Sequence, residues 1–170
     1  MTQETLVLGE GELAPEILAA ANINPTTGLA TDYLNHFNEV VMLMEMLGDM
    51  PDCAEDVLDW KPASYPQHFE HSTFKDKQLA ILAYRAAPRD LRLHLETIIL
   101  QLDRTVINAQ FIIRENEVDQ ATGQRLARIA THDVRPLIAA ASGAIHGHID
   151  PSLDLGESTQ ANVDALFTQG

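Results

Sequence analysis

Apolar side chains recur every three or four residues along most of the chain, which is the spacing that places them on one face of an α-helix. The three longest stretches with this spacing are 29–47, 89–115 and 120–145. Breaking residues delimit the first two, since Gly48 and Pro51 follow the first stretch and Pro88 directly precedes the second. We therefore expect three long helices.

Shorter helical stretches fill much of the remaining sequence. They are 15–21, 52–60 and 67–87, with a break in the last one near Ser72 and Thr73. Many Ala and Leu residues and few aromatic ones favour helix over strand. The sequence thus predicts an all-α fold, a single-domain helical bundle in which shorter helices flank three long ones.

The same pattern predicts how the domain is organised. Residues 1–24 are expected to form a loose N-terminal arm followed by a short helix, and residues 25–150 to form the bundle core. Residues 151–170 are a polar tail, which either adds one short helix over 159–167 or stays loose.

The stretch 89–115 carries apolar residues on two sides when it is drawn as a helix with about 100° per residue. One side holds Leu95, Ile98, Leu102, Val106 and Ala109, and the other holds Leu93, Leu100, Ile107 and Phe111. A helix with two apolar sides is expected at the centre of its bundle. Between the two sides lies a polar stripe of Glu96, Asp103 and Gln110, which is then expected to be partly buried.

Composition narrows the range of partners. The chain has 170 residues, and its 25 Asp and Glu against 11 Lys and Arg give a formal net charge of −14. A field this negative works against nucleic acid and anionic membrane surfaces as partners. The hydrophobic fraction of 45% is too high for a disordered acidic protein. Cys53 is the single cysteine, which excludes an internal disulfide framework and a multi-cysteine metal site.

Targeting signals are not evident in the sequence. The first residues lack a basic start followed by a long apolar run, and no stretch approaches about 20 consecutive apolar residues. Neither a secretory signal nor membrane insertion is therefore expected, and we expect a cytoplasmic protein.

Four side chains on two long helices form a candidate metal site. His36 and Glu39 share one helix face, and Glu96 and Asp103 share another. Carboxylates on or beside apolar faces require a partner, and carboxylate with imidazole ligands suits a divalent transition metal such as iron, manganese or zinc. The nearby pair His68 and His71 is a candidate to complete this set.

A structural alternative explains the same residues without a metal. Arg92 lies four positions before Glu96 and is placed to form an ion pair with it along the helix. His36 and Glu39 are then a solvated pair on the surface of their own helix.

The segment His132-Asp133-Val134-Arg135-Pro136-Leu137 resembles the phosphoacceptor box of sensor histidine kinases. The resemblance implies that His132 accepts a phosphoryl group and that Asp133 helps to set its protonation, in a histidine phosphotransfer-like module. The family has one residue between the basic residue and the proline, whereas this chain has none. The structural alternative is a helix kinked at Pro136, with Asp133 in the core-facing arc.

Two stretches suggest contacts with other surfaces. The small residues of 139–144 permit close approach of another helix, either within the chain or at a dimer seam. The first long helix carries Met42, Met44 and Met46, which belong either to the core or to an adaptable partner-binding surface.

The sequence shows no nucleophile elbow and no phosphate-binding glycine loop, so it predicts no catalytic residue and no cofactor-binding motif. We therefore favour a non-catalytic binding or regulatory module that binds a protein partner or a second copy of itself. The first alternative is a metal-binding carboxylate and histidine bundle. The second is the phosphotransfer-like module with His132 as acceptor.

Overall fold

The computed structural model describes residues 6–150, and within them the chain forms helices and connections without any strand. The α-helices are α1 Pro15–Ala20, α2 Asn35–Met46, α3 Ala54–Asp59, α4 Tyr65–His71, α5 Lys77–Ala86, α6 Arg89–Glu115, α7 Gln120–Ile129 and α8 Arg135–Ile145. The all-α prediction is confirmed. The tail 151–170 and its expected short helix lie outside the described residues. In the described part, no helix is both long and apolar enough to cross a membrane.

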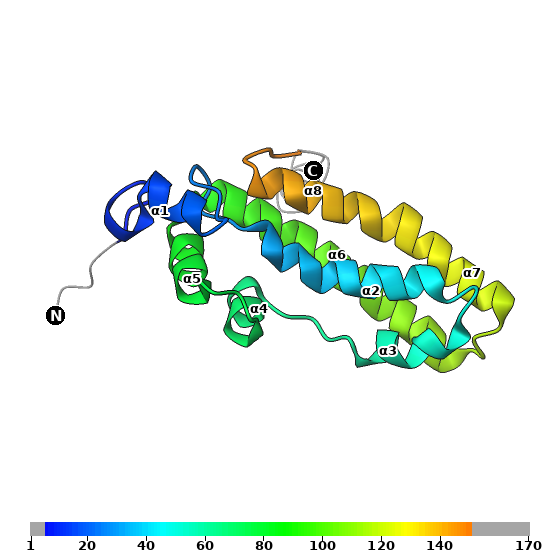
Figure 1. The fold of residues 1–170 in the computed structure, drawn as a ribbon. Coiled ribbons are helices and arrows are strands. Elements are labelled where there is room, and N and C mark those ends of the chain that lie inside the picture. Colours follow the sequence, from blue (N-terminus) through cyan, green and yellow to red (C-terminus); the bar gives the residue numbers. More distant parts are fainter. Residues whose placement is uncertain (1–5, 151–170) are drawn as a thin grey trace, which may run out of the picture.

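α6 is the longest of these helices, with 27 residues, and it runs along the length of the bundle (Figure 1). α2 lies beside it, and α7 followed by α8 runs along both (Figure 1). α3 lies near the end where α6 finishes, whereas α1, α4 and α5 lie towards the end where α6 begins (Figure 1). The three long helical stretches expected from the periodicity therefore pack together, and the short helices lie around them.

The core lies between these long courses. Phe37, Val41 and Met44 of α2 are fully buried, and they share one hydrophobic cluster with Leu102 and Val106 of α6. Burying an apolar side chain of this size contributes about 1.5–3 kcal/mol. The apolar positions that predict the helices are thus the positions that hold them together.

Small residues allow α8 to approach α6 closely. Ala141 and Ala144 are fully buried, and the contact between α6 and α8 is the most extensive one between two helices. Of the two roles expected for the run 139–144, the structure shows the packing within the chain.

The segment before α2 also packs on the bundle. Leu13, Leu18 and Ile23 are buried. Thr27 is fully buried, and its hydroxyl donates a hydrogen bond to the carbonyl oxygen of Ile145 at 2.6 Å. This bond ties the N-terminal segment to the last turn of α8.

The prediction that α6 is buried on both of its apolar sides is wrong. The side with Leu102 forms the core, but Leu93, Leu100, Ile107 and Phe111 are 45%, 56%, 45% and 58% exposed. The short helix α5 meets α6 at Arg92 and Glu96, and α4 lines a pocket with the same edge of α6. Within residues 6–150, no element covers the sector of α6 opposite the core.

α7 and α8 are joined by a π-helical turn, Ala130–Val134, in which the N–H of Arg135 donates to the carbonyl of Ala130. Ala130 and Val134 are buried, whereas Asp133 is exposed. The expectation that Asp133 joins the core-facing arc is therefore wrong. The reason is that a π turn closes over five residues where an α turn closes over four, so a wheel drawn at constant α-helical spacing misplaces the residues within it.

The backbones of α7 and the end of α2 pass very close to each other. Gly123 of α7 is buried, and a Cβ atom added to it would lie 2.4 Å from the carbonyl oxygen of Leu47. Only a residue without a side chain allows the backbones to approach to this distance.

The substitution Gly123→Ala is expected to lower the free energy of unfolding by about 1–3 kcal/mol, because the added methyl group overpacks the contact with Leu47. The matched control is Gly143→Ala in α8, where the nearest atom to a new Cβ belongs to His148 at 3.8 Å. The control is expected to be more stable than the wild type by about 0.5–1 kcal/mol, since alanine favours helix over glycine. Urea denaturation followed by circular dichroism measures both, and equal gains in the two variants would contradict the close approach.

Candidate functional site

A pocket of about 340 Å³ opens between α6 and the segments that precede it. Its polar lining includes Tyr33, Tyr65, Tyr84, Glu96 and Asp103, and its apolar lining includes Leu95, Ile99 and Leu100. We call it the tyrosine pocket. Its volume lies at the lower end of the range of small-molecule sites, which is about 300–1,000 Å³.

Three separate elements supply the tyrosines. Tyr33 lies in the 3-10 helix Thr31–Leu34, Tyr65 begins α4, and Tyr84 lies in α5. The rings of Tyr65 and Tyr84 stack with centroids 4.5 Å apart, and Tyr33 meets Tyr65 edge-on at 5.1 Å. Aromatic pairs in these arrangements contribute about 0.5–1.5 kcal/mol beyond the area that they bury. The rings therefore form one packed unit.

Hydrogen bonds fix the positions of these rings. The Tyr33 hydroxyl donates to the carbonyl oxygen of Ala63 at 2.7 Å, and the Tyr65 hydroxyl accepts from the N–H of Ala30 at 2.8 Å. Burial raises the pKa of all three tyrosines well above its ordinary value. The pocket is thus lined by neutral phenols.

Glu96 is held by a tyrosine rather than by an arginine. Its Oε1 accepts a hydrogen bond from the Tyr84 hydroxyl. Arg92 instead donates to the carbonyl oxygen of Arg85 at 3.0 Å and lies over the Tyr84 ring at 5.9 Å from its centroid. The expected ion pair between Arg92 and Glu96 is therefore not the contact that forms.

Asp103 is the least satisfied group of the pocket. Its Oδ1 is buried and has no hydrogen-bond partner among the described residues. Burial raises the pKa of its carboxyl group to about 6. The ionisable groups around it are Glu96 from the same helix, Tyr33 from the 3-10 helix and Tyr84 from α5. Asp103 is thus a partly buried carboxyl group without a cationic partner among the described residues, although a carboxylate in this position is expected to be paired.

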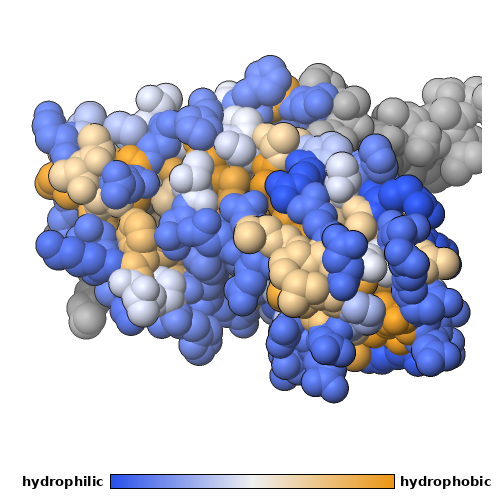
Figure 2. Space-filling model, turned by 45° about the vertical axis from the view of Figure 1, so that its right-hand side comes forward, coloured by the Kyte–Doolittle hydropathy of each residue, from blue (hydrophilic) through white to orange (hydrophobic). Residues whose placement is uncertain are grey.

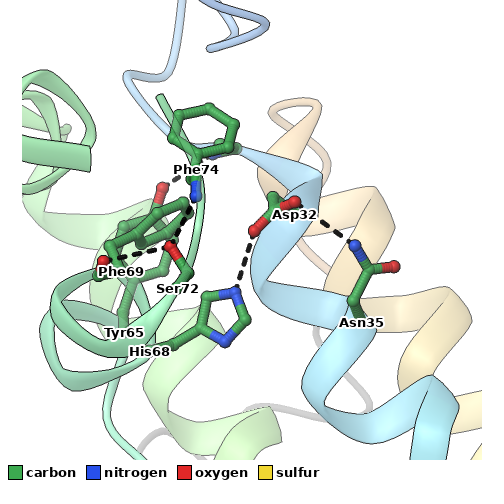
Figure 3. Close-up of polar contacts among 8 residues, drawn as sticks. Asp32, Asn35, Tyr65, His68, Phe69, Ser72 and Phe74 are labelled. Atoms are coloured by element: carbon green, nitrogen blue, oxygen red, sulfur yellow. Dashed lines mark hydrogen bonds and ion pairs between the residues drawn. The ribbon is translucent and has the colours of Figure 1, made fainter. Parts of the chain in front are cut away.

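The histidines next to the pocket are engaged in packing and hydrogen bonds. His68 of α4 points towards the 3-10 helix that precedes α2, where its Nε2 lies 2.9 Å from Oδ2 of Asp32 (Figure 3). Asn35 donates to the other oxygen of Asp32 at 3.3 Å (Figure 3). His36 stacks on Trp60 with centroids 4.7 Å apart. Burial, together with the nearby His68, lowers the pKa of His36 to about 4, so this ring is neutral near pH 7.

The structure does not assemble the predicted metal set. Glu96 and Asp103 line the tyrosine pocket, but Glu39 lines a different hollow, beside Met42 and Asp59. His71 is exposed. Among residues 6–150, no group of three or more His, Cys, Asp or Glu side chains is placed to hold a metal ion. A metal needs several ligands in one coordination sphere, and these side chains are spread over separate places, with His36 and His68 lying beside each other but in neither lining.

The phosphoacceptor segment is accessible at the surface. His132 and Asp133 are both exposed in the π-helical turn. The resemblance to histidine kinases remains a prediction, and the turn differs from the continuous helix that it implies.

Sequence reasoning selected Glu96 and Asp103 but missed the tyrosines that surround them. The chain contains three tyrosines, and all three line this one pocket. They come from separate elements, so no local spacing connects them. The available signal was the scarcity of aromatic residues, 5% of the chain, which makes the gathering of every tyrosine at one place informative.

Comparisons with known proteins add no further constraint. No protein-family model, no curated protein and no solved structure matches the chain. The function is therefore argued from the geometry.

The raised pKa of Asp103 predicts a specific pH dependence of stability. An unfolded aspartate titrates near pH 3.9, whereas the folded one titrates near 6, so only the folded state binds this proton between those values. The contribution of Asp103 to the free energy of unfolding should therefore fall as pH rises from about 4 to 6, while His36, with its lowered pKa, contributes in the opposite direction. The stability of the wild type relative to Asp103→Asn should fall over this range. Urea denaturation at several pH values measures the difference between the two proteins. The exposed Asp133→Asn is the control, and an identical pH profile for wild type and Asp103→Asn would contradict the burial of Asp103.

Proposed function

We propose that the chain is a binding module without chemistry of its own, and that its tyrosine pocket binds a small organic ammonium ion. The observation that carries the proposal is the buried Oδ1 of Asp103, which has no hydrogen-bond partner in residues 6–150 although Asp103 belongs to the lining of an open pocket. Leaving such an atom unsatisfied is unfavourable by about 1–3 kcal/mol, and more for a charged group. A ligand that donates an N–H bond to it would remove this penalty.

The charges of the pocket favour a ligand that carries a positive charge. Glu96 and Asp103 both line it, while Arg92 is directed to the Arg85 carbonyl and the Tyr84 ring. Neither carboxylate takes part in an ion pair within the described residues. Charge-assisted hydrogen bonds from an ammonium group to carboxylates are about twice as strong as neutral ones.

The rest of the pocket lining favours an apolar or aromatic group attached to that charge. Leu95, Ile99 and Leu100 offer apolar contact beside the carboxylates. Tyrosine rings attract cations that lie near them, by about 0.5–2 kcal/mol. A protonated amine on an apolar or aromatic body therefore matches the pocket better than an inorganic ion does.

The lining supports binding rather than catalysis. The hydroxyl of Ser64, the other polar residue of the lining, caps α4 by accepting from the N–H of Gln67 at 3.2 Å. Tyr33 and Tyr84 donate their protons to fixed acceptors, and their raised pKa values disfavour a phenolate near pH 7.

Isothermal titration calorimetry with 2-phenylethylammonium tests this proposal. We expect saturable binding that weakens at least tenfold in Asp103→Asn, because that variant keeps the shape but removes the charge. The wild-type affinity should also fall about tenfold from pH 7 to pH 5, as Asp103 takes up a proton.

Two controls sharpen the experiment. Asp133→Asn should bind like the wild type, since Asp133 is exposed and lies outside the pocket. The neutral analogue 2-phenylethanol should bind far more weakly than the amine. Equal affinity for the alcohol and the amine, or an unchanged affinity in Asp103→Asn, would contradict the proposal.

A second candidate function rests on the outer edge of α2. Met42, Met46 and Met50 are 56%, 39% and 52% exposed, in contrast to Met44, which is in the core. Hollows of about 770 and 410 Å³ lie on the two sides of Met42 and Met46. Figure 2 shows one face of the molecule, on which hydrophobic side chains gather in patches between hydrophilic ones.

The rim of these hollows is acidic, with Glu39, Asp49, Asp56 and Asp59. Adaptable methionines surrounded by carboxylates favour a partner helix that carries apolar residues on one face and Lys or Arg on the other. This matches the protein partner expected from the sequence.

A synthetic 20-residue amphipathic helix of Leu and Lys is the probe for this second function. We expect fluorescence anisotropy to report binding that weakens at least fivefold in the double variant Met42→Gln, Met46→Gln. The control is Ile17→Gln, which removes an apolar side chain of similar exposure, 45%, on α1. Equal losses in both variants would indicate non-specific attraction to the negative charge alone.

A further inference from the structure

The solvent-facing side of α6 is apolar along its centre. Leu93, Leu100, Ile107 and Phe111 follow one another at intervals of seven, seven and four residues. At about 100° per residue, this spacing places all four within about 40° of each other on the helix. We call this row the α6 stripe. It lies opposite Leu102, which faces the core.

Such a row differs from the ordinary apolar content of a protein surface. Single exposed apolar residues are common, whereas contiguous ones mark interaction surfaces. Each member of the α6 stripe is at least 45% exposed, and the row extends over 19 of the 27 positions of α6. A repeat of seven residues is also the spacing at which two helices wind around each other.

The charges at the two ends of α6 indicate what covers the stripe. Each end carries two adjacent residues of opposite charge, Arg89 with Asp90 and Arg114 with Glu115. On the helical wheel, Arg114 lies on one side of the stripe, and Arg89 lies at that same edge of it, at the angle of Ile107. Asp90 and Glu115 lie on the other side. One flank is therefore basic at both ends, and the opposite flank is acidic at both ends.

This arrangement is complementary to itself in one orientation only. When two such helices pair in parallel around a two-fold axis, the basic flank of each faces the acidic flank of the other at both ends. When they pair antiparallel, each flank faces its own copy, so that Arg89 meets Arg114 and Asp90 meets Glu115. Like charges in contact disfavour the second arrangement.

We propose that the α6 stripe pairs with the α6 stripe of a second copy of this chain, in a parallel two-fold dimer. Leu93, Leu100 and Ile107 form its layers, each packed on the same residue of the other copy. Phe111 closes the seam at the C-terminal end. The two flanking charge pairs set the orientation and the register.

The seam and the tyrosine pocket share only Leu100. Arg92 and Glu96, which border the stripe, are already engaged with Tyr84. The dimer therefore does not depend on the ligand proposed for the pocket. Variants at positions 93, 107, 111 and 114 alter the seam without altering the pocket lining.

Sedimentation equilibrium of the full chain tests the association. We expect a mass that rises with concentration towards twice the 18.7 kDa of one chain. The double variant Ile107→Glu, Phe111→Glu should remain a monomer at concentrations where the wild type is dimeric, because four carboxylates would meet in the seam. The control is Ile17→Glu, which changes an equally exposed apolar residue on α1 and should leave the dimer intact.

The orientation has its own test. In a Cys53→Ala background, Leu93→Cys should form an intermolecular disulfide on mild oxidation, because only parallel pairing brings the two copies of residue 93 together. The exposed Ile17→Cys is the control and should not cross-link in this way. Arg114→Glu should weaken the dimer about tenfold, and the swap Arg114→Glu, Glu115→Arg should restore it.

Several outcomes would overturn the proposal. A wild-type chain that stays monomeric up to about 1 mM has no such interface. A dimer that persists in the Ile107→Glu, Phe111→Glu variant uses another surface. A dimer that Leu93→Cys does not cross-link, and that the charge swap fails to restore, is not parallel. Circular dichroism of each variant shows that the helices remain folded.

Discussion

The fold depends on side chains that satisfy the backbone of the connection between α3 and α4. The amide of Gln110, which is only 4% exposed, donates to the carbonyl oxygens of Val57 and Trp60 at 2.9 and 2.7 Å. The hydroxyl of Tyr33 donates to the carbonyl oxygen of Ala63 at 2.7 Å. Buried carbonyls require such donors, because an unpaired one is costly. The Gln110 bonds hold the connection against α6, and the Tyr33 bond fixes Ala63 in the wall of the tyrosine pocket.

The helices were predictable because each long one buries a stripe at regular spacing. The same periodicity failed for the outer side of α6. Spacing shows that Leu93 and Ile107 share a side, but it does not show whether another element covers that side. Leu102 and Leu100 are alike in the sequence, yet one is fully buried and the other is 56% exposed. Tertiary packing decides between them, and that information is spread over the whole chain.

The carboxylates of the candidate site could be predicted from the sequence, but the tyrosines around them could not. Glu96 and Asp103 stood out because they lie between apolar helix faces, where a carboxylate needs a partner. Their surroundings were not visible, since Tyr84 reaches Glu96 from another helix and Tyr33 comes from a segment far away along the chain. The local choice, Arg92, was wrong because the Tyr84 hydroxyl from α5 bonds Glu96, while Arg92 bonds the Arg85 carbonyl.

The π turn at Ala130–Val134 determines how α8 is rotated about its axis relative to α7. These two helices pack on different neighbours. α7 packs mainly on α2, whereas α8 packs mainly on α6. Immediately after the turn, Arg135 donates from Nε to Glu45 of α2 at 2.8 Å. Removing one residue from the turn would rotate α8 by about 100° relative to α7. The alanines of α8 would then no longer face α6. The extra residue therefore acts as a spacer, which lets α7 pack on α2 while α8, directly after it, packs on α6.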